Sequence, residues 1–126
     1  MRDEIDPRYE YAEALSGPIP DYLLEVERQT FLKTMAPQML SGQLQGRLLS
    51  LFSKLCQPKT ILEVGTFTGY SALCLAEGLV PGGILHAIEG NRDTAGRAQQ
   101  TFGAAPCADN VQLPTGKAPD RPLGPP

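Results

Sequence analysis

The chain has 126 residues, with 11 basic and 14 acidic side chains and a formal charge of −3. This balance excludes nucleic-acid binding through a basic surface and gives no electrostatic reason to bind an anionic membrane. Apolar residues make up 41% of the chain and charged residues 20%, which is typical of a globular protein. The length allows a single domain.

The cysteines and the N-terminus indicate the compartment. Cys56, Cys74 and Cys107 are too few, and odd in number, for a disulfide framework. The N-terminus alternates charges without the apolar stretch of a signal peptide, and no uncharged run approaches the ~18 residues that cross a bilayer. We therefore expect a soluble, cytoplasmic protein with reduced thiols.

Composition divides the chain into an N-terminal arm (1–20), a folded domain (21–113) and a proline-rich tail (114–126). Five of the 12 prolines fall in the last 13 residues, where Leu123 is the only large apolar side chain. Such a segment buries too little apolar surface to offset the cost of ordering, so we expect disorder. The tail is either a linker or a sign that the reading frame or fragment ends before the domain does.

Two amphipathic helices are expected in the first half of the domain. The first begins with Asp21 as its cap and runs to about Met35, before Pro37. Its predicted apolar face consists of Leu24, Phe31, Leu32 and Met35. The second runs from near Ser41 to Pro58 and has the clearest stripe at helical spacing. That stripe, which predicts core or dimer packing, consists of Leu44, Leu48, Leu51, Phe52 and Leu55.

The pattern then changes to short apolar runs separated by helical segments. Residues 61–64 and 84–88 predict buried strands, and a third strand could begin at Val111. Between them, residues 70–77 and 91–102 predict helices. Alternating strands and helices indicate a parallel sheet with right-handed crossovers, so the fold class is α/β with a helical N-terminal extension.

The helix predicted over residues 91–102 has a recognisable residue at each end. Asn91 can cap its start and Gly103 is expected to close it. The lone histidine, His86, lies inside an apolar strand, which favours a structural role over a catalytic one.

Residues 63–71 join the first strand to the next helix and carry the pattern Glu-x-Gly-x-x-x-Gly. Gly65 and Gly69 permit a tight turn and close approach of a ligand to the backbone. Open α/β sheets bind ligands beyond the carboxyl ends of their strands, which is where this loop lies. Glu89 ends the second strand and can accept hydrogen bonds from both hydroxyls of a ribose. The loop and Glu89 together predict an adenosine pocket.

The details of the loop favour one adenosine cofactor. The GxGxxG fingerprint of a dinucleotide site is absent, which disfavours a nicotinamide-dependent oxidoreductase. The carboxylate of Glu63 would repel a pyrophosphate and suits a ligand that carries an ammonium or sulfonium charge. S-adenosylmethionine meets this requirement.

Residues 61–73 resemble the first motif of the cation-dependent O-methyltransferases, the group that contains catechol and caffeoyl-CoA O-methyltransferases. Residues 39–46 and 82–91 are also similar to family segments, so the resemblance covers roughly residues 20–113. It implies an incomplete Rossmann-like class I methyltransferase sheet of about three parallel strands. It also implies methyl transfer from S-adenosylmethionine to a hydroxyl of a small, aromatic acceptor.

The resemblance assigns a set of cofactor-binding positions. They are Met39, Ser41, Glu63, Gly65, Thr66, Phe67, Gly69, Ser71 and Glu89. Glu63 would lie near the methionyl amino group, Ser71 would hydrogen-bond the cofactor carboxylate, and Glu89 would hold the ribose. Met39 and Ser41 would close over the methionyl part.

The family places its metal-binding aspartate, a neighbouring lysine and an Asp-Asn pair on later strands that have no counterpart here. A divalent cation is expected for full-length members, but neither its ligands nor catalytic residues are assigned in this chain. The alternative hypothesis is a non-catalytic remnant or interaction module of the same fold. The expected partners are a small-molecule hydroxyl acceptor and a second copy of the chain, with no nucleic acid or membrane.

Overall fold

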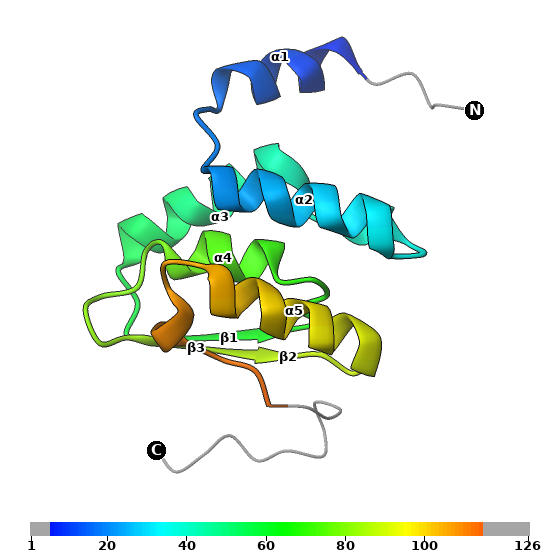
Figure 1. Ribbon diagram of the computed structural model, residues 1–126. Helices are drawn as coiled ribbons and strands as arrows, with labels where there is room; N and C mark the ends of the chain where they lie inside the picture. Colours follow the sequence, from blue (N-terminus) through cyan, green and yellow to red (C-terminus); the bar gives the residue numbers. More distant parts are fainter. Residues whose placement is uncertain (1–5, 115–126) are drawn as a thin grey trace.

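A computed structural model describes residues 6–114, which fold into a parallel sheet with helices on one face (Figure 1). The strands, hydrogen-bonded in the order of the chain, are β1 (Thr60–Val64), β2 (Ile84–Ile88) and β3 (Val111–Gln112). The register pairs Leu62 with His86, and Leu85 with Val111. The predicted α/β class and all three strands are confirmed. The predicted disorder concerns residues 114–126, of which only Pro114 is described, so residues 115–126 of this prediction lie outside the described residues.

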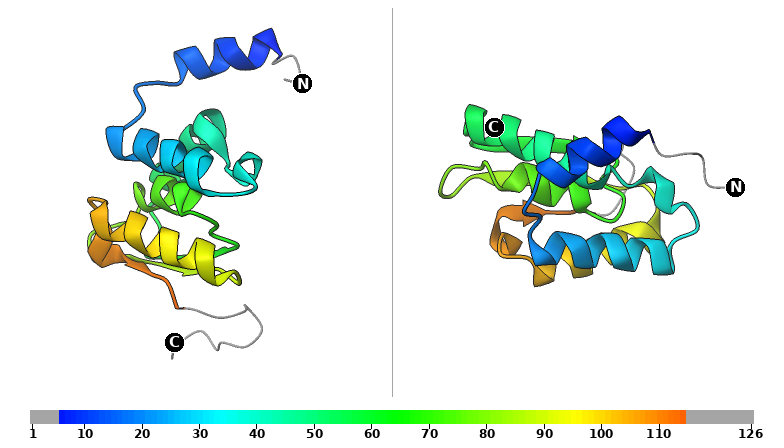
Figure 2. Two further views of the ribbon diagram at one scale, coloured as in Figure 1. Left: turned by 45° about the vertical axis from the view of Figure 1, so that its right-hand side comes forward. Right: turned by 90° about the horizontal axis from the view of Figure 1, so that it is seen from above.

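Five α-helices and two short 3-10 turns are described. They are α1 (Pro7–Leu15), α2 (Asp21–Lys33), η1 (Pro37–Met39), α3 (Gly42–Cys56), α4 (Tyr70–Ala76), α5 (Arg92–Ala104) and η2 (Ala108–Asn110). Figures 1 and 2 show α4 and α5 directly on the sheet, α2 and α3 outside them, and α1 set apart. No helix among the described residues is both long and apolar enough to cross a membrane.

The core forms where α4 is enclosed between the sheet and α3. Leu73 and Cys74 of α4, and Leu85 and Ala87 of β2, are buried. A Cβ at Gly46 of α3 would lie 2.7 Å from the ring of Tyr70, so only glycine allows α3 to approach this closely.

The apolar face predicted for α2 is wrong. Leu23, Val26 and Thr30 are buried, whereas the predicted positions Leu24, Phe31, Leu32 and Met35 are exposed. The buried face includes a threonine because its hydroxyl is hydrogen-bonded inside the structure, and hydrophobicity alone does not reveal such a contact. The ends also differ: Pro20 occupies the N-cap position, so Asp21 is the first helical residue, and the helix ends at Lys33.

The stripe on α3 also faces away from the described core. Small side chains, Gly46, Ser50 and Ser53, are the buried positions of this helix. The stripe residues that are exposed are Leu48, Leu51, Phe52 and Leu55. The prediction that this stripe packs in the core is therefore wrong for the described residues. The face of α3 that contacts α4 carries small side chains instead, because the two helices lie close together.

Two further expectations need correction. Strand β1 is not buried on both faces, because Leu62 and Val64 are 48% and 62% exposed on the face without helices. Helix α5 continues through Gly103 and ends at Ala104. The cap at its start is confirmed, since the Asn91 side chain accepts hydrogen bonds from the backbone N–H groups of Asp93 and Thr94.

Glu77, at the end of α4, joins this helix to α2 and α3. Its carboxylate accepts hydrogen bonds from Arg47 at 2.7 Å, Ser50 at 2.5 Å and Tyr22 at 3.3 Å, and lies 3.0 Å from the Lys54 ammonium. Burial alone would raise the pKa of Glu77, but the hydrogen bonds from Arg47, Ser50 and Lys54 outweigh it and lower the pKa to about 2.

The Glu77 cluster predicts a specific loss of stability in acid. A carboxyl whose pKa is lower in the folded state stabilises the fold above its unfolded pKa and ceases to do so as pH falls toward the folded value. Between pH 5 and pH 2 we expect a loss of about 2–3 kcal/mol from this group. Urea unfolding across this range should show a shallower acid slope for Glu77→Gln than for the unaltered chain. The exposed-site control Glu10→Gln should keep the full slope, and equal slopes in all three proteins would contradict the assignment.

Candidate functional site

The loop between β1 and α4 makes a tight turn over the carboxyl end of β2. The backbone N–H groups of Gly65 and Thr66 both donate to the Ile88 carbonyl, at 2.8 and 3.1 Å. Gly65 and Gly69 adopt positive φ angles of 82° and 97°, which glycine accepts without strain. The glycine spacing therefore forms the turn expected of it.

Two side chains outside the loop fix its second half. A Cβ at Gly69 would lie 2.7 Å from the Phe102 ring of α5, so the ring packs directly on the backbone. The hydroxyls of Thr68 and Thr30 lie 2.8 Å apart, and both residues are buried. Because the Thr30 hydroxyl donates to the Val26 carbonyl, Thr68 is the donor of this pair. The loop is thus attached to α2 and α5.

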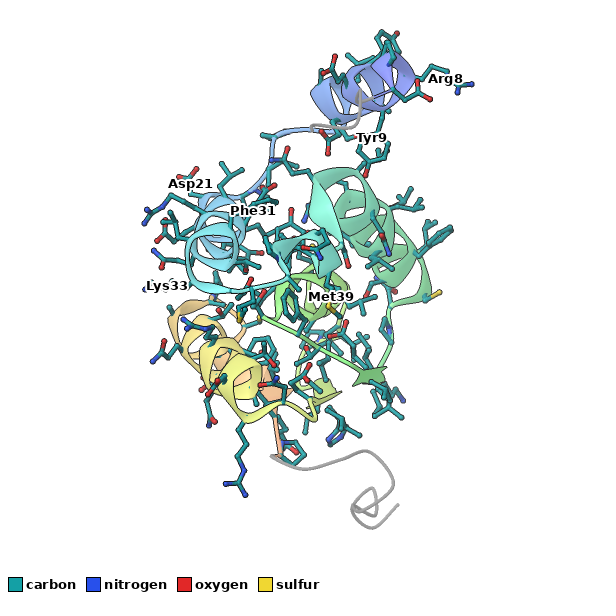
Figure 3. The ribbon with its side chains drawn as sticks, turned by 90° about the vertical axis from the view of Figure 1, so that its right-hand side faces the viewer. Arg8, Tyr9, Asp21, Phe31, Lys33 and Met39 are labelled. Carbon is teal, nitrogen blue, oxygen red and sulfur yellow. The ribbon has the colours of Figure 1, made fainter. Side chains whose placement is uncertain are left out.

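Two adjoining cavities of about 440 and 40 Å³ lie over the loop. Both are lined by Met39, Gly65 and Phe67. A Cβ at Gly65 would meet no heavy atom within 4 Å, so the space above this glycine is open. The larger cavity extends between the end of α2 and the start of α5, and Figure 3 shows Lys33 where these helices approach each other.

Glu89 lines the larger cavity at the end of β2. One oxygen, Oε2, accepts the backbone N–H of Phe67 at 2.8 Å, and the other, Oε1, accepts that of Asn91 at 2.9 Å. A carboxylate oxygen can accept more than one hydrogen bond, so both retain capacity for a ligand. Glu89 can therefore receive two ligand hydroxyls without releasing the backbone.

Glu63 lies behind the wall of the smaller cavity. Its two oxygens accept the hydroxyls of Thr66 at 2.5 Å and Ser71 at 2.7 Å, and both of those residues line the cavity. Burial raises the pKa of Glu63, and the two hydroxyl hydrogen bonds only partly oppose this. A half-buried, partly desolvated carboxylate next to a cavity favours a cationic ligand, which would offset its loss of hydration.

The structure brings most of the positions assigned from the sequence around these cavities. Those that line a cavity are Met39, Ser41, Gly65, Thr66, Phe67, Ser71 and Glu89. Glu63 lies behind the hydroxyls of Thr66 and Ser71, and Gly69 is buried against Phe102. His86 lies on β2, paired with Leu62, as a strand residue.

Sequence reasoning missed other residues of the site. Lys33 and Arg97 line the larger cavity, and the Thr30 hydroxyl holds the loop through its hydrogen bond with Thr68. No motif marks them, because they come from helices that approach the loop only in the folded chain. Within residues 6–114, no group of three or more His, Cys, Asp or Glu side chains could hold a metal ion.

The Gly69 contact gives a stability prediction with a matched control. Gly69→Ala places a Cβ at positive φ and against Phe102, so we expect a loss of about 2 kcal/mol or more in the free energy of unfolding. Gly96→Ala, inside α5, meets no atom within 4 Å and should gain up to about 1 kcal/mol. Urea unfolding of both variants measures the difference. A Gly69→Ala variant as stable as Gly96→Ala would show that the close packing is absent.

Comparison with known proteins places the chain among methyltransferases. Residues 13–121 match the family described as O-methyltransferase. A catechol O-methyltransferase of Niastella koreensis is 42% identical over 76 residues, which are 60% of this chain and 34% of that protein. The catechol O-methyltransferase of Sus scrofa is 34% identical over 79 residues, covering 63% of this chain and 42% of that protein.

Solved structures agree with these relatives. An SAH-bound methyltransferase of Podospora anserina superposes with a TM-score of 0.83 at 30% identity, covering 90% of this chain and 49% of that one. The O-methyltransferase TomG of Streptomyces achromogenes, in complex with SAM, gives 0.83 at 33% identity, covering 91% and 51%. The chain thus spans about half the length of these structures and less of the curated relatives.

Proposed function

Because the chain belongs to the O-methyltransferase family and has the Rossmann-like fold of class I methyltransferases, we propose that it binds S-adenosylmethionine as the cofactor-binding part of an O-methyltransferase. The methyl acceptor would be a hydroxyl of a small, aromatic molecule. One observation carries this proposal: two carboxylates, Glu63 and Glu89, are held by loop donors beside adjoining cavities over the loop.

The chemistry of the two cavities fits the two ends of this cofactor. Glu89 would accept hydrogen bonds from the ribose hydroxyls, because its oxygens keep acceptor capacity beside the larger cavity. The smaller cavity, with Ser71 on its wall and Glu63 behind it, would take the methionyl end, whose ammonium group compensates the half-buried carboxylate. Met39 and Ser41 would close over that end.

The residues of this chain would bind and orient the cofactor. When bound, S-adenosylmethionine supplies a methyl group on a sulfonium, which a hydroxyl oxygen of the acceptor can attack in line. Holding the sulfonium in one orientation lowers the entropic cost of that alignment. Activation of the acceptor by a divalent cation, as in the family, would require ligands other than those in residues 6–114.

The proposed cofactor site predicts pH-dependent binding. Since the pKa of Glu63 is raised, lowering the pH neutralises this carboxyl before an ordinary glutamate and removes its attraction for the ammonium group. Isothermal titration with S-adenosylhomocysteine should show saturable binding at neutral pH that weakens as Glu63 is protonated. Glu63→Gln should bind more weakly at neutral pH and lose this part of the pH dependence.

The contradicting results are distinct. No heat from a folded sample would count against cofactor binding itself. If S-adenosylhomocysteine binding to Glu63→Gln kept its full pH dependence, the chain would still be a cofactor binder, but Glu63 would not be the group that attracts the ammonium end. Glu10→Gln, which changes an exposed acid on α1 that lines neither cavity, is the control and should behave as the unaltered chain.

The cysteines and the net charge support a location and a class of partner. We propose a cytoplasmic location, consistent with three free cysteines, of which Cys56 is exposed. The net charge of −3 supports a small-molecule acceptor rather than nucleic acid as the partner.

The exposed stripe of α3, residues 48–55, supports a homodimer. Its members Leu48, Leu51, Phe52 and Leu55 recur at helical spacing and are exposed. No charged residue lies between Leu48 and Ser53, so two copies related by a twofold axis would bring no like charges together along most of the stripe. We therefore propose that a second copy covers it.

Substitution within the stripe tests the dimer. Sedimentation equilibrium of the unaltered chain should give twice the monomer mass, and Leu51→Glu should give the monomer because it buries a charge in the interface. Gln99→Glu, at an exposed site on α5 outside the stripe, should remain dimeric. A monomeric unaltered chain at micromolar concentration would overturn the proposal.

A second candidate function, an interaction module, rests on the sheet. Among the described residues β1 pairs only with β2, and its Leu62 and Val64 are exposed. An exposed, apolar edge strand favours pairing with another polypeptide. Failure to bind S-adenosylhomocysteine by a chain that forms stable complexes through this edge would favour this function over methyl transfer.

A further inference from the structure

The loop over the cavities contains one residue whose backbone conformation is unfavourable. Phe67 has a φ of 54°, in the left-handed region that residues other than glycine rarely adopt. Gly65 and Gly69, on either side, also have positive φ but carry no such cost. Phe67 lines both cavities, so its backbone conformation shapes the site.

The backbone N–H of Phe67 is held by the side chain of Glu89. The N–H donates to Oε2 at 2.8 Å, and a hydrogen bond to a charged acceptor is stronger than one between neutral groups. The other oxygen, Oε1, accepts the N–H of Asn91 at 2.9 Å, immediately before α5. The same carboxylate therefore connects the loop to the start of the next helix.

The neighbouring loop residues are held in a different way. The backbone N–H groups of Gly65 and Thr66 donate to the backbone carbonyl of Ile88, so these two N–H groups are held by the strand and not by a side chain. Phe67 is the next residue along, and its N–H is bound by a carboxylate that a single substitution can remove. The left-handed turn thus coincides with a contact made by a side chain.

We propose that Glu89 is a positioning residue for the loop, holding Phe67 in its left-handed conformation before any ligand binds. This role is additional to the ribose contact and rests on the proposed function only for its consequence in catalysis. It separates two effects of Glu89: the hydrogen bonds that it would accept from a ribose, and the shape of the loop on which a cofactor would rest.

Amide hydrogen exchange of the unliganded chain tests the positioning role directly. In Glu89→Gln and Glu89→Ala, the Phe67 amide should exchange about tenfold faster or more, because a charge-assisted hydrogen bond is weakened or lost. The Thr66 amide, bound to Ile88, should keep its protection in the same samples. The control Asp93→Asn removes an equal charge from the same cavity but has no hydrogen bond to the loop, and should leave both amides unchanged.

A rescue variant covers the case in which loss of Glu89 disturbs the whole fold. Phe67→Gly introduces a residue that adopts positive φ without strain, so it should restore Thr66 protection and unfolding stability in the Glu89→Gln background. Unchanged exchange of the Phe67 amide in folded Glu89 variants would overturn the proposal. Global destabilisation that Phe67→Gly does not relieve would also overturn it.

The test is independent of cofactor binding. A chain that fails to bind S-adenosylhomocysteine but shows faster Phe67 exchange in the Glu89 variants would refute the proposed function and retain the positioning role. A chain that binds S-adenosylhomocysteine but shows no change in Phe67 exchange in the Glu89 variants would retain the proposed function and refute the positioning role.

Discussion

The site depends on how the carboxyl end of β2 holds the loop that follows β1. Three consecutive backbone N–H groups, from Gly65 to Phe67, donate to acceptors at this strand end, first to the Ile88 carbonyl and then to the Glu89 carboxylate. Parallel pairing of β1 with β2 places the loop and these acceptors at the same edge of the sheet. The backbone beneath the open space above Gly65 is therefore held by the end of β2.

Electrostatics divides the site into two regions of different character. Glu89 lines the larger cavity, where its oxygens keep unused acceptor capacity. Glu63 is half-buried behind the hydroxyls of Thr66 and Ser71, where desolvation raises its pKa and favours a positively charged neighbour. A nucleoside that carries a positive charge at its other end satisfies both carboxylates, whereas a pyrophosphate would be repelled by each.

Local patterns in the sequence were sufficient to predict the strands and the glycine turn, and to place Glu63 and Glu89 beside that turn. Each depends on neighbouring residues: short apolar runs form the parallel strands, and Gly65 and Gly69 take the positive φ angles of the turn. Asn91 caps α5 for the same reason, since its side chain reaches only the next turn.

The faces of α2 and α3 could not be predicted from hydrophobicity. On α2, Thr30, whose hydroxyl joins Thr68, is buried beside Leu23 and Val26, and on α3 small residues such as Gly46 allow α4 to approach. The contacts of Thr30 and Gly46 are tertiary contacts between segments far apart in the chain, and several large apolar residues of these helices, such as Phe31 and Phe52, remain exposed. The same reasoning explains why Lys33 and Arg97 were missed at the larger cavity.

The central claim, that the two carboxylates and the loop between them form one cofactor site, is tested most directly by nuclear magnetic resonance. Titration with S-adenosylhomocysteine should shift the backbone amide signals of Phe67, Ser71 and Asn91 together, with one common saturation curve, and leave those of α1 unchanged. Shifts confined to one end of the loop, or to residues away from the two cavities, would contradict the account.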